Sequence, residues 1–494
     1  AVENPHHARR WLILAVLGIA QLMVVLDATV VNIALPTAQH ALGFSDNSRQ
    51  WIVTAYALAF GSLLLLGGRL ADLIGRKRTF LIGLAGFAVA SAIGGAATSF
   101  GMLVVARAVQ GGFGALLAPA GLALLTTTFT EPRERARAFG IYGAIAGAGA
   151  AVGLLLGGVL TEFASWRWTM FVNLIFAGIA FMGGLSLLHH RPAEQRPRLD
   201  LPGTLAVSGG LFALVYGFSH AETAGWSSPT TLGFLVTAVV LLIAFVRIQL
   251  TSAHPLLPLR VVLDRNRGGA FFAMFTSAVG MFGIFLVLTY YLQQILGYSA
   301  LRSGVAFLPM VVALVLASTT ASTTLSGRVS PRVLIPAGLA LSAVGMYLLT
   351  GLSVHSDYLT AIMPSTLVTG AGMGLVFASA MSVATLGVRP DDAGVASAAV
   401  NTVQQVGGSI GTALLNTIAA TAASGYLATH LASHATGALT GHGGASVLQS
   451  AAVHSYVVAF WWSAAVFAVG ALIAALILKP GVPQPSETEA LALV

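Results

Sequence analysis

The sequence contains no cysteine and very few charged residues. Asp, Glu, Lys and Arg make up 8% of its 494 residues, compared with about 25% in an average soluble protein. Hydrophobic residues reach 56%. The absence of cysteine excludes disulfide bonds, thiol chemistry and cysteine-based metal sites. The shortage of charge excludes an ordinary soluble enzyme and predicts a membrane protein with many transmembrane segments.

Several functional motifs are also missing. There is no GxxxxGK[ST] loop, which argues against an ATP-driven pump. No two of the 12 histidines have HExxH spacing, and His430, His434, His442 and His454 are irregularly spaced and have no accompanying carboxylate. We therefore expect no metal, no cofactor and no catalytic site. Residues 425–454, which hold these four histidines, are predicted to form a flexible outer loop.

Long apolar runs dominate the rest of the chain. A helix needs about 20 apolar residues to cross a bilayer. Fourteen candidate spans lie at residues 11–35, 50–70, 79–98, 102–128, 137–161, 168–188, 203–219, 230–249, 268–293, 303–325, 332–351, 358–380, 394–424 and 455–478. An even number of spans places both termini on the same side of the membrane.

The basic residues are distributed unevenly between the two sides. Of 24 Lys and Arg residues, 20 fall on the side that holds the termini, three fall on the opposite side, and Arg107 lies inside a span. Lys and Arg are enriched in cytoplasmic loops. We therefore expect both termini to be cytoplasmic. The same bias, rather than nucleic-acid binding, explains the net charge of +8.

The spans contain a weak internal repeat. Residues 107–114 in the fourth span resemble residues 366–373 in the twelfth, and the glycine-rich fifth span resembles the thirteenth. Two six-helix halves with two inserted helices would produce this offset, and such duplications are common in secondary transporters. The predicted domains are therefore residues 1–188, a linking region 189–267 with the inserted helices, and residues 268–494.

One carboxylate, Asp27, lies inside the first apolar run. An Asp at the bilayer centre costs about 2.5–3.5 kcal/mol, so such acids tend to face a cavity and to have a function. Asp27 lies 16 residues after Trp11, which is about 24 Å of helix. Arg107 approaches from the outer side and reaches a similar depth. The two are therefore candidate partners, directly or through Gln110.

The loop between the second and third spans reads GRLADLIGRKR from Gly68 to Arg78. It closely resembles the GxLaDrxGrkx signature of the major facilitator superfamily in spacing, position and cytoplasmic location. The resemblance implies an all-α membrane fold of two six-helix bundles, here with two inserted helices. It also implies a cytoplasmic latch between the halves, to which Gly68, Asp72, Gly75 and Arg76 would belong.

Other segments resemble the fourteen-helix drug:proton antiporters of this superfamily. These segments are residues 26–36 (LDATVVNIALP), 166–173, 291–299 and 401–408. Arg107, Gln110, Gly111 and Gly114 are similar to the RxxQGxG motif of the fourth span. The resemblance covers nearly the whole chain.

The fifth span resembles an exporter-specific glycine motif through Gly149, Gly153, Gly157 and Gly158. Glycines at this spacing allow two helices to pack closely. Leu154 stands where that motif has proline, so the kink that a proline provides is absent. This departure affects how the helix would bend during a transport cycle.

The resemblance places the first and fourth spans on one cavity and implies a proton-linked role for Asp27. A low-dielectric site favours the protonated acid, whereas Arg107 favours the carboxylate. A change in their separation between inward-facing and outward-facing states would load and release a proton. The alternative is a static buried ion pair. Glu162 is a second candidate acid, with a solvated cap or a partner of Arg167 as its alternative.

Polar and aromatic side chains within the spans are candidates for contact with substrate. They are Gln21, Asn32, Trp51, Tyr56, Tyr142, Tyr290, Gln293, Gln294, Asn401 and Gln405. Apolar pockets with few polar anchors suit broad recognition. The second half has no intramembrane acid, which favours a lipophilic monocation or a neutral amphiphile over a dication.

Together these features predict a monomeric secondary transporter of the bacterial cytoplasmic membrane. It would export hydrophobic drugs or antibiotics in exchange for protons by alternating access. Its expected partners are a small lipophilic substrate, protons and membrane lipids. One alternative is a dedicated exporter of a single endogenous product, such as an antibiotic, a siderophore or a lipid. Another is a channel or receptor, which would lack the repeat and the latch motif.

Overall fold

The computed structural model describes residues 9–44, 46–188, 200–252, 255–325, 327–388, 392–433 and 442–481, and within these ranges it contains helices and no strand. The first eight helices are α1 (Arg10–Leu42), α2 (Asp46–Ile74), α3 (Arg76–Gly95), α4 (Phe100–Thr128), α5 (Pro132–Phe163), α6 (Trp168–Leu187), α7 (Leu201–Ala224) and α8 (Pro229–Thr251). The remaining α-helices are α9 (Leu259–Val262), α10 (Arg265–Tyr290), α11 (Ala300–Ala306), α12 (Leu308–Thr320), α13 (Pro331–Leu349), α14 (Met363–Thr385), α15 (Ala393–Ser433) and α16 (His442–Ile477). Three short π-helical segments adjoin them: η2 (Tyr291–Ile295), η3 (Ala321–Leu325) and η4 (Tyr358–Ile362).

The helices correspond to the predicted spans one to one. η2 extends α10, η4 precedes α14, and α11, α12 and η3 together form the tenth span, so the described residues contain fourteen long helical segments. On the described residues alone, eleven of these segments are long and apolar enough to cross a membrane. The predicted all-α membrane architecture is confirmed.

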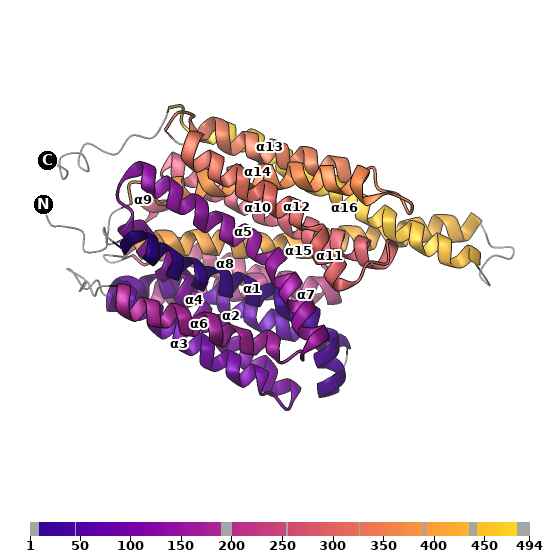
Figure 1. Cartoon of the computed structure of the whole chain (residues 1–494), viewed down its shortest axis with the longest axis horizontal. Coiled ribbons are helices and arrows are strands. Elements are labelled where there is room, and N and C mark those ends of the chain that lie inside the picture. The colour runs from indigo at the N-terminus through magenta and orange to yellow at the C-terminus, as the bar shows by residue number, and fades with distance from the viewer. Residues whose placement is uncertain are drawn as a thin grey trace, which may run out of the picture.

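The long helices lie side by side in two groups (Figure 1). The first group, α1–α6, is drawn in indigo to magenta, and the second group, α10–α16, in orange to yellow. α5 lies between the groups, in contact with α1 on one side and with α12 and α14 on the other. α15 likewise contacts α2 and α4. The inserted helices α7 and α8 pack against each other, and α7 also contacts α2 and α15.

Glycines at corresponding positions bring the helices of each group together. A Cβ atom at Gly111 of α4 would overlap the carbonyl oxygen of Tyr56 in α2. A Cβ atom at Gly370 of α14 would overlap the carbonyl oxygen of Met310 in α12. Backbones can approach this closely only where a residue has no side chain. Because Gly111 and Gly370 match in the sequence repeat, the two groups form this helix pair in the same way.

A stripe of glycines on α5 lets α1 approach closely. Cβ atoms added at Gly149, Gly153 and Gly157 would press into residues 25–30 of α1. The fourth glycine of the motif, Gly158, instead faces α11 of the second group. α5 therefore contacts α1 with one face and the second group with another.

The expectation of a flexible loop at residues 425–454 is wrong over most of its length. α15 continues to Ser433, and α16 begins at His442. The two helices project together beyond the others at the right-hand end of Figure 1. Alanine is the strongest helix former, and this alanine-rich segment extends both helices rather than forming an irregular loop.

The four histidines of this segment provide no metal site that the structure describes. The His454 ring lies 5.1 Å from the Tyr426 ring, whereas the side chains of His430, His434 and His442 fall outside the described set. In the described part of the chain, no three His, Asp or Glu side chains are grouped as metal ligands.

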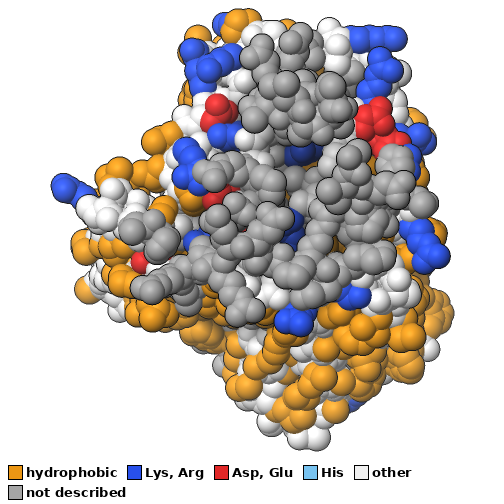
Figure 2. Space-filling view, turned by 90° about the vertical axis from the view of Figure 1, so that its left-hand side faces the viewer, with side chains coloured by type: hydrophobic (Ala, Val, Ile, Leu, Met, Phe, Trp, Pro, Cys, Tyr) orange, Lys and Arg blue, Asp and Glu red, His pale blue; other side chains and the backbone are white. Residues whose placement is uncertain are grey.

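Basic side chains gather at the end of the molecule where α1 begins and α16 ends (Figure 2). Hydrophobic side chains cover the flanks next to this face. Ion pairs join neighbouring helix ends there: Arg10 lies 2.7 Å from Glu134, and Arg260 lies 2.7 Å from Asp392. An apolar surface with a basic rim at one end is typical of a membrane protein.

A stability prediction follows from the close packing at the glycine stripe of α5. Gly153→Ala would place a methyl group on the Thr29 hydroxyl of α1, and overpacking of this kind costs about 1–3 kcal/mol. We expect a lower midpoint of thermal unfolding in detergent. Gly178→Ala in α6 is the matched control, because nothing lies within 4 Å of a Cβ atom there. Equal midpoints for the two variants would contradict the packing described.

Candidate functional site

Asp27 of α1 and Arg107 of α4 form an ion pair in the interior of the first group. Nη1 of Arg107 donates to Oδ2 of Asp27 at 2.6 Å. The exposed fractions are 0% for Asp27 and 1% for Arg107. The structure thus brings together the two charges that the depth estimate matched.

Three further polar side chains complete this site. Gln110 donates from Nε2 to Oδ1 of Asp27 at 2.8 Å and accepts from Nη1 of Arg107 at 2.6 Å. Asn173 of α6 donates from Nδ2 to the same Oδ1 at 2.6 Å. Ser91 of α3 accepts from Gln110 at 2.6 Å and from Asn173 at 3.2 Å. Asp27 therefore accepts three hydrogen bonds, one of them from the guanidinium of Arg107.

Arg107 is also held by α2. Its Nε donates to the carbonyl oxygen of Ile52 at 3.3 Å, and its guanidinium carbon lies 4.3 Å from the centre of the Tyr56 ring. An arginine over an aromatic face gains a cation–π contact, which is stronger when water is excluded. Tyr56, which is predicted as a substrate contact, is buried beside Arg107.

Sequence reasoning assigned neither Ser91 nor Asn173 to the site. Both are short polar residues within apolar runs, and such residues often bond to the backbone of their own helix. The only sequence signal for Asn173 was its depth in the membrane, which is similar to that of Arg107. Asn173 lies near the N-terminal end of α6, as Arg107 does on α4. What the sequence could not give was the direction in which each side chain points.

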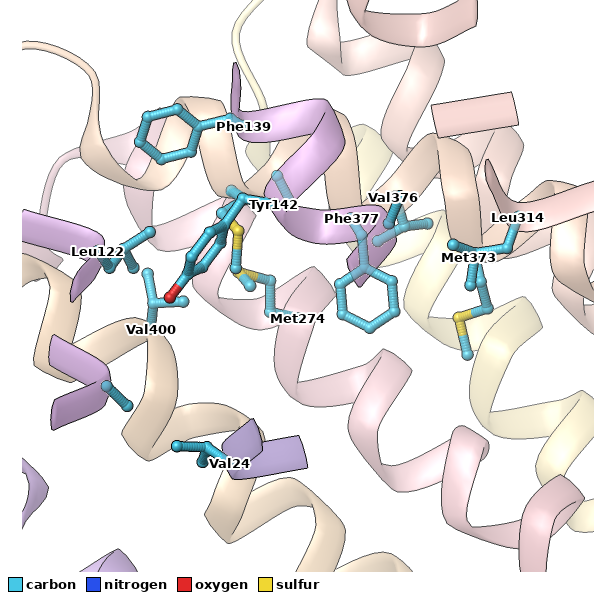
Figure 3. Close-up of a cluster of buried hydrophobic side chains, with 14 of the residues drawn as sticks. Val24, Leu122, Phe139, Tyr142, Met274, Leu314, Met373, Val376, Phe377 and Val400 are labelled. Carbon is cyan, nitrogen blue, oxygen red and sulfur yellow. The ribbon is translucent and has the colours of Figure 1, made fainter. Parts of the chain in front are cut away.

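A second set of side chains lies where the two groups meet (Figure 3). Tyr142 of α5 is at its centre, and its hydroxyl donates to Oε1 of Gln21 in α1 at 2.8 Å. The structure thus brings two predicted substrate contacts together. The surrounding buried side chains come from both groups: Val24, Leu122, Phe139, Met274, Leu314, Met373, Val376, Phe377 and Val400.

The other predicted substrate contacts do not join this cluster. Trp51, Tyr290, Gln293 and Gln294 are exposed, and the last three lie at the C-terminal end of α10 and in η2. They were grouped with Tyr142 because polarity alone does not distinguish a helix end from a helix interior.

Two candidates on α15 are half-buried. Asn401 donates to the carbonyl oxygen of Ser397 in its own helix at 3.0 Å, and Gln405 lies against Gly61 of α2. Gln405 is thus at a contact between the groups. The side chains of Asn32 and Leu154, the departure from the exporter motif, lie outside the described set.

The structure separates Glu162 from the buried acid. Glu162 is exposed near the C-terminal end of α5, whereas Asp27 is fully buried. The suggested partner, Arg167, donates to the carbonyl oxygens of Gly95 at 2.8 Å and Ala97 at 2.7 Å. Glu162 therefore does not belong to the Asp27 site.

The loop after α2, which carries the GRLADLIGRKR motif, forms a tight turn. Gly75 has φ +97°, a conformation that favours glycine, and Gly68 is buried. Asp72 lies 3.7 Å from Arg76 on the following helix. The pair belongs to the first group, so its latch role stays a prediction.

A contact between the groups at this end involves a residue that sequence reasoning overlooked. Nη2 of Arg135, at the start of α5, donates to the carbonyl oxygen of Thr385 at the end of α14 at 2.7 Å. Both residues are buried. Several basic residues lie near the turn before α5, and no sequence feature distinguishes Arg135 from the others.

Comparison with known proteins now decides the family. Residues 17–412 match the family described as the Major Facilitator Superfamily. The chain belongs to this superfamily. It is 48% identical over 482 residues to the puromycin resistance protein pur8 of Streptomyces alboniger, covering 97% of this chain and 93% of that protein. It is 40% identical over 418 residues to the cephamycin export protein CmcT of Amycolatopsis lactamdurans, covering 84% and 86%.

A solved structure shares the fold. The human organic anion transporter MFSD10 (TETRAN) superimposes with a TM-score of 0.65 at 15% identity, covering 94% of this chain and 99% of that one. The predicted family and fold are therefore confirmed. The chain is a multi-pass membrane transporter of the major facilitator superfamily rather than an enzyme.

A second stability prediction follows from the buried ion pair. Arg107→Gln leaves Asp27 as an unpaired buried charge, a change that typically costs about 3–5 kcal/mol. We expect a large fall in the thermal unfolding midpoint in detergent. Adding Asp27→Asn removes the unpaired charge and should restore most of the loss.

Arg78→Gln, at an exposed position at the start of α3, is the control for loss of an arginine. If the double variant were no more stable than Arg107→Gln alone, the two charges would not be coupled as the geometry indicates.

Proposed function

We propose that the chain exports hydrophobic antibiotics or related compounds from the cytoplasm, in exchange for protons, by alternating access. The names of two relatives refer to puromycin resistance and cephamycin export, which supports outward transport of antibiotics. The observation that carries the proton coupling is the buried Asp27 with its three donors. A titratable group in this position, in a transporter, is a proton-pathway candidate.

Asp27 would act as the proton carrier. With Arg107, Gln110 and Asn173 in place, the carboxylate is stabilised. A helix movement that separates these donors from Asp27 would leave the acid in an apolar surrounding, where the protonated form is favoured. Alternation between the two arrangements would take up a proton on one side of the membrane and release it on the other.

The substrate would bind near Tyr142, where the groups meet. The lining is apolar, with the hydrogen bond between Tyr142 and Gln21 as a polar anchor. In the described part of the second group, acidic side chains lie only at helix ends, at Asp264, Asp357 and Asp392. A lipophilic monocation or a neutral amphiphile fits this lining better than a dication.

A dedicated exporter of one natural product is the second candidate. The names of the two relatives each mention a single antibiotic, which favours this narrower function. Comparing the transport of many unrelated dyes with that of individual antibiotics, in a strain that lacks other pumps, distinguishes the two.

The proposed location is the cytoplasmic membrane of a bacterium, with both termini in the cytoplasm and the chain acting as a monomer. The basic face in Figure 2 supports this orientation, because Lys and Arg favour the cytoplasmic side. The exchanged partners would be protons and the small lipophilic substrate, in contact with membrane lipids.

Because the chain has no cysteine, orientation can be tested with single introduced cysteines. Thr130→Cys and His355→Cys are exposed at opposite ends of the molecule. In intact cells, an impermeant maleimide should label His355→Cys and not Thr130→Cys. The reverse pattern would invert the proposed topology.

The proton-carrier role predicts a specific defect. In everted vesicles with an imposed ΔpH, Asp27→Asn should abolish dye accumulation, because residue 27 can no longer bind and release a proton. Glu162→Gln removes a carboxylate that lies outside the site, and should leave accumulation unchanged. Normal ΔpH-driven dye accumulation by the Asp27→Asn variant would contradict the proposal.

A further inference from the structure

The two groups of helices meet along two seams. At one seam, α2 of the first group contacts α15 of the second. At the other, α5 of the first group contacts α12 of the second. On the described residues, these seams are the routes by which a compound dissolved in the membrane would reach the contact between the groups.

The α2–α15 seam is covered by the inserted helices. Leu65 of α2 and Ala398 of α15 share one buried cluster with Val207 and Leu211 of α7. At Gly61 of α2, a Cβ atom would lie 3.0 Å from Gln405 of α15 and 3.9 Å from Val215 of α7. The three helices therefore meet at one point, with α7 lying over the other two.

Polar bonds fasten the α7–α8 pair at both ends. At the cytoplasmic end, Asp200 caps α7 and accepts from Nε2 of Gln249 in α8 at 2.8 Å, while Oε1 of Gln249 accepts from the Leu257 amide at 3.0 Å. At the outer end, Nε1 of Trp226 donates to the hydroxyl of Thr417 in α15 at 2.9 Å. Asp200 and Gln249 are buried, so breaking their bond would leave polar groups unsatisfied.

The α5–α12 seam has no such cover within the described residues. Its helices touch directly, with the Ser318 hydroxyl donating to the Gly140 carbonyl oxygen at 2.8 Å. Val315, one helical turn before Ser318 on the same face, has 37% of its surface exposed. Ile141 of α5 is partly exposed beside Gly140. The edges of this seam are thus apolar and open to lipid.

This open seam leads directly to the central cluster. Leu314 and Tyr142 directly adjoin Val315 and Ile141 in sequence, and both lie among the buried side chains of Figure 3. Along each helix, one residue thus lies at the lipid-facing edge and its neighbour in the cluster. A lipid-dissolved molecule that parted α5 from α12 would come next to Tyr142.

We propose that the α7–α8 pair seals one lateral seam against lipid, so that lipophilic substrate reaches the centre from the bilayer only between α5 and α12. The proposal rests on the proposed export function, since it concerns the route of that substrate. It assigns a task to the two helices that lie outside both six-helix groups.

The test compares two cysteines at matched depth in an otherwise cysteine-free chain. Val315 lies 10 residues before Leu325, and Val240 of α8 lies 11 residues before Thr251, each about 15 Å from the cytoplasmic helix end. Val240 has 58% of its surface exposed and lies on α8, which packs against α7. Val315→Cys and Val240→Cys are labelled in membranes with a lipid-soluble maleimide, with and without rhodamine 6G, a lipophilic monocation.

We expect rhodamine 6G to slow labelling of Val315→Cys severalfold and to leave Val240→Cys unchanged. Val315→Trp should correspondingly lower the initial rate of ΔpH-driven rhodamine transport severalfold, with Val240→Trp at the wild-type rate. Equal protection at both cysteines, protection at Val240→Cys alone, or protection at neither would overturn the proposal. Failure of the wild-type chain to transport the dye would count against the export function itself, which separates the two results.

Discussion

A full positive and a full negative charge lie together in the apolar interior, and the first helix group is arranged to hold them. Moving two ions out of water costs several kcal/mol per ion, and their attraction compensates only when the geometry is good and the remaining polar atoms are bonded. Asp27 meets this condition through Arg107, Gln110 and Asn173. The relative positions of α1, α4 and α6 therefore set the stability of the carboxylate, and a shift among these helices alters it.

The second group repeats the packing of the first but not its charges. Thr366 and Thr369 occupy the positions that match Arg107 and Gln110. The Thr369 hydroxyl donates to the carbonyl oxygen of its own helix at Ser365, and α13 approaches it closely at a glycine. Proton binding or release at Asp27 would thus take place in the first group. Its effect would reach the second group through the contacts between their helices. α5 is suited to transmit it, because it packs on the Asp27 segment of α1 and on α12.

The sequence predicted the features that depend on the length of an apolar run and on the depth of a residue in the membrane. Apolar runs located the fourteen helices, and helix rise matched the depth of Arg107 to that of Asp27. It did not predict what depends on rotation about a helix axis. Asn173 points to the site and Glu162 does not, because packing between helices sets those directions. The outer segment 425–454 was misjudged because glycine and serine suggested a loop, while alanine continued the helices.

The most direct test of the account is proton release from the purified transporter. If the carboxylate and the substrate-bound state are linked, adding a transported substrate to the protein in weakly buffered detergent should release a proton, and Asp27→Asn should bind the substrate without releasing one. A pH electrode or indicator dye measures the release, and tryptophan fluorescence measures the binding. Undiminished release from Asp27→Asn, with binding intact, would show that the proton is carried elsewhere and would contradict the central role of Asp27.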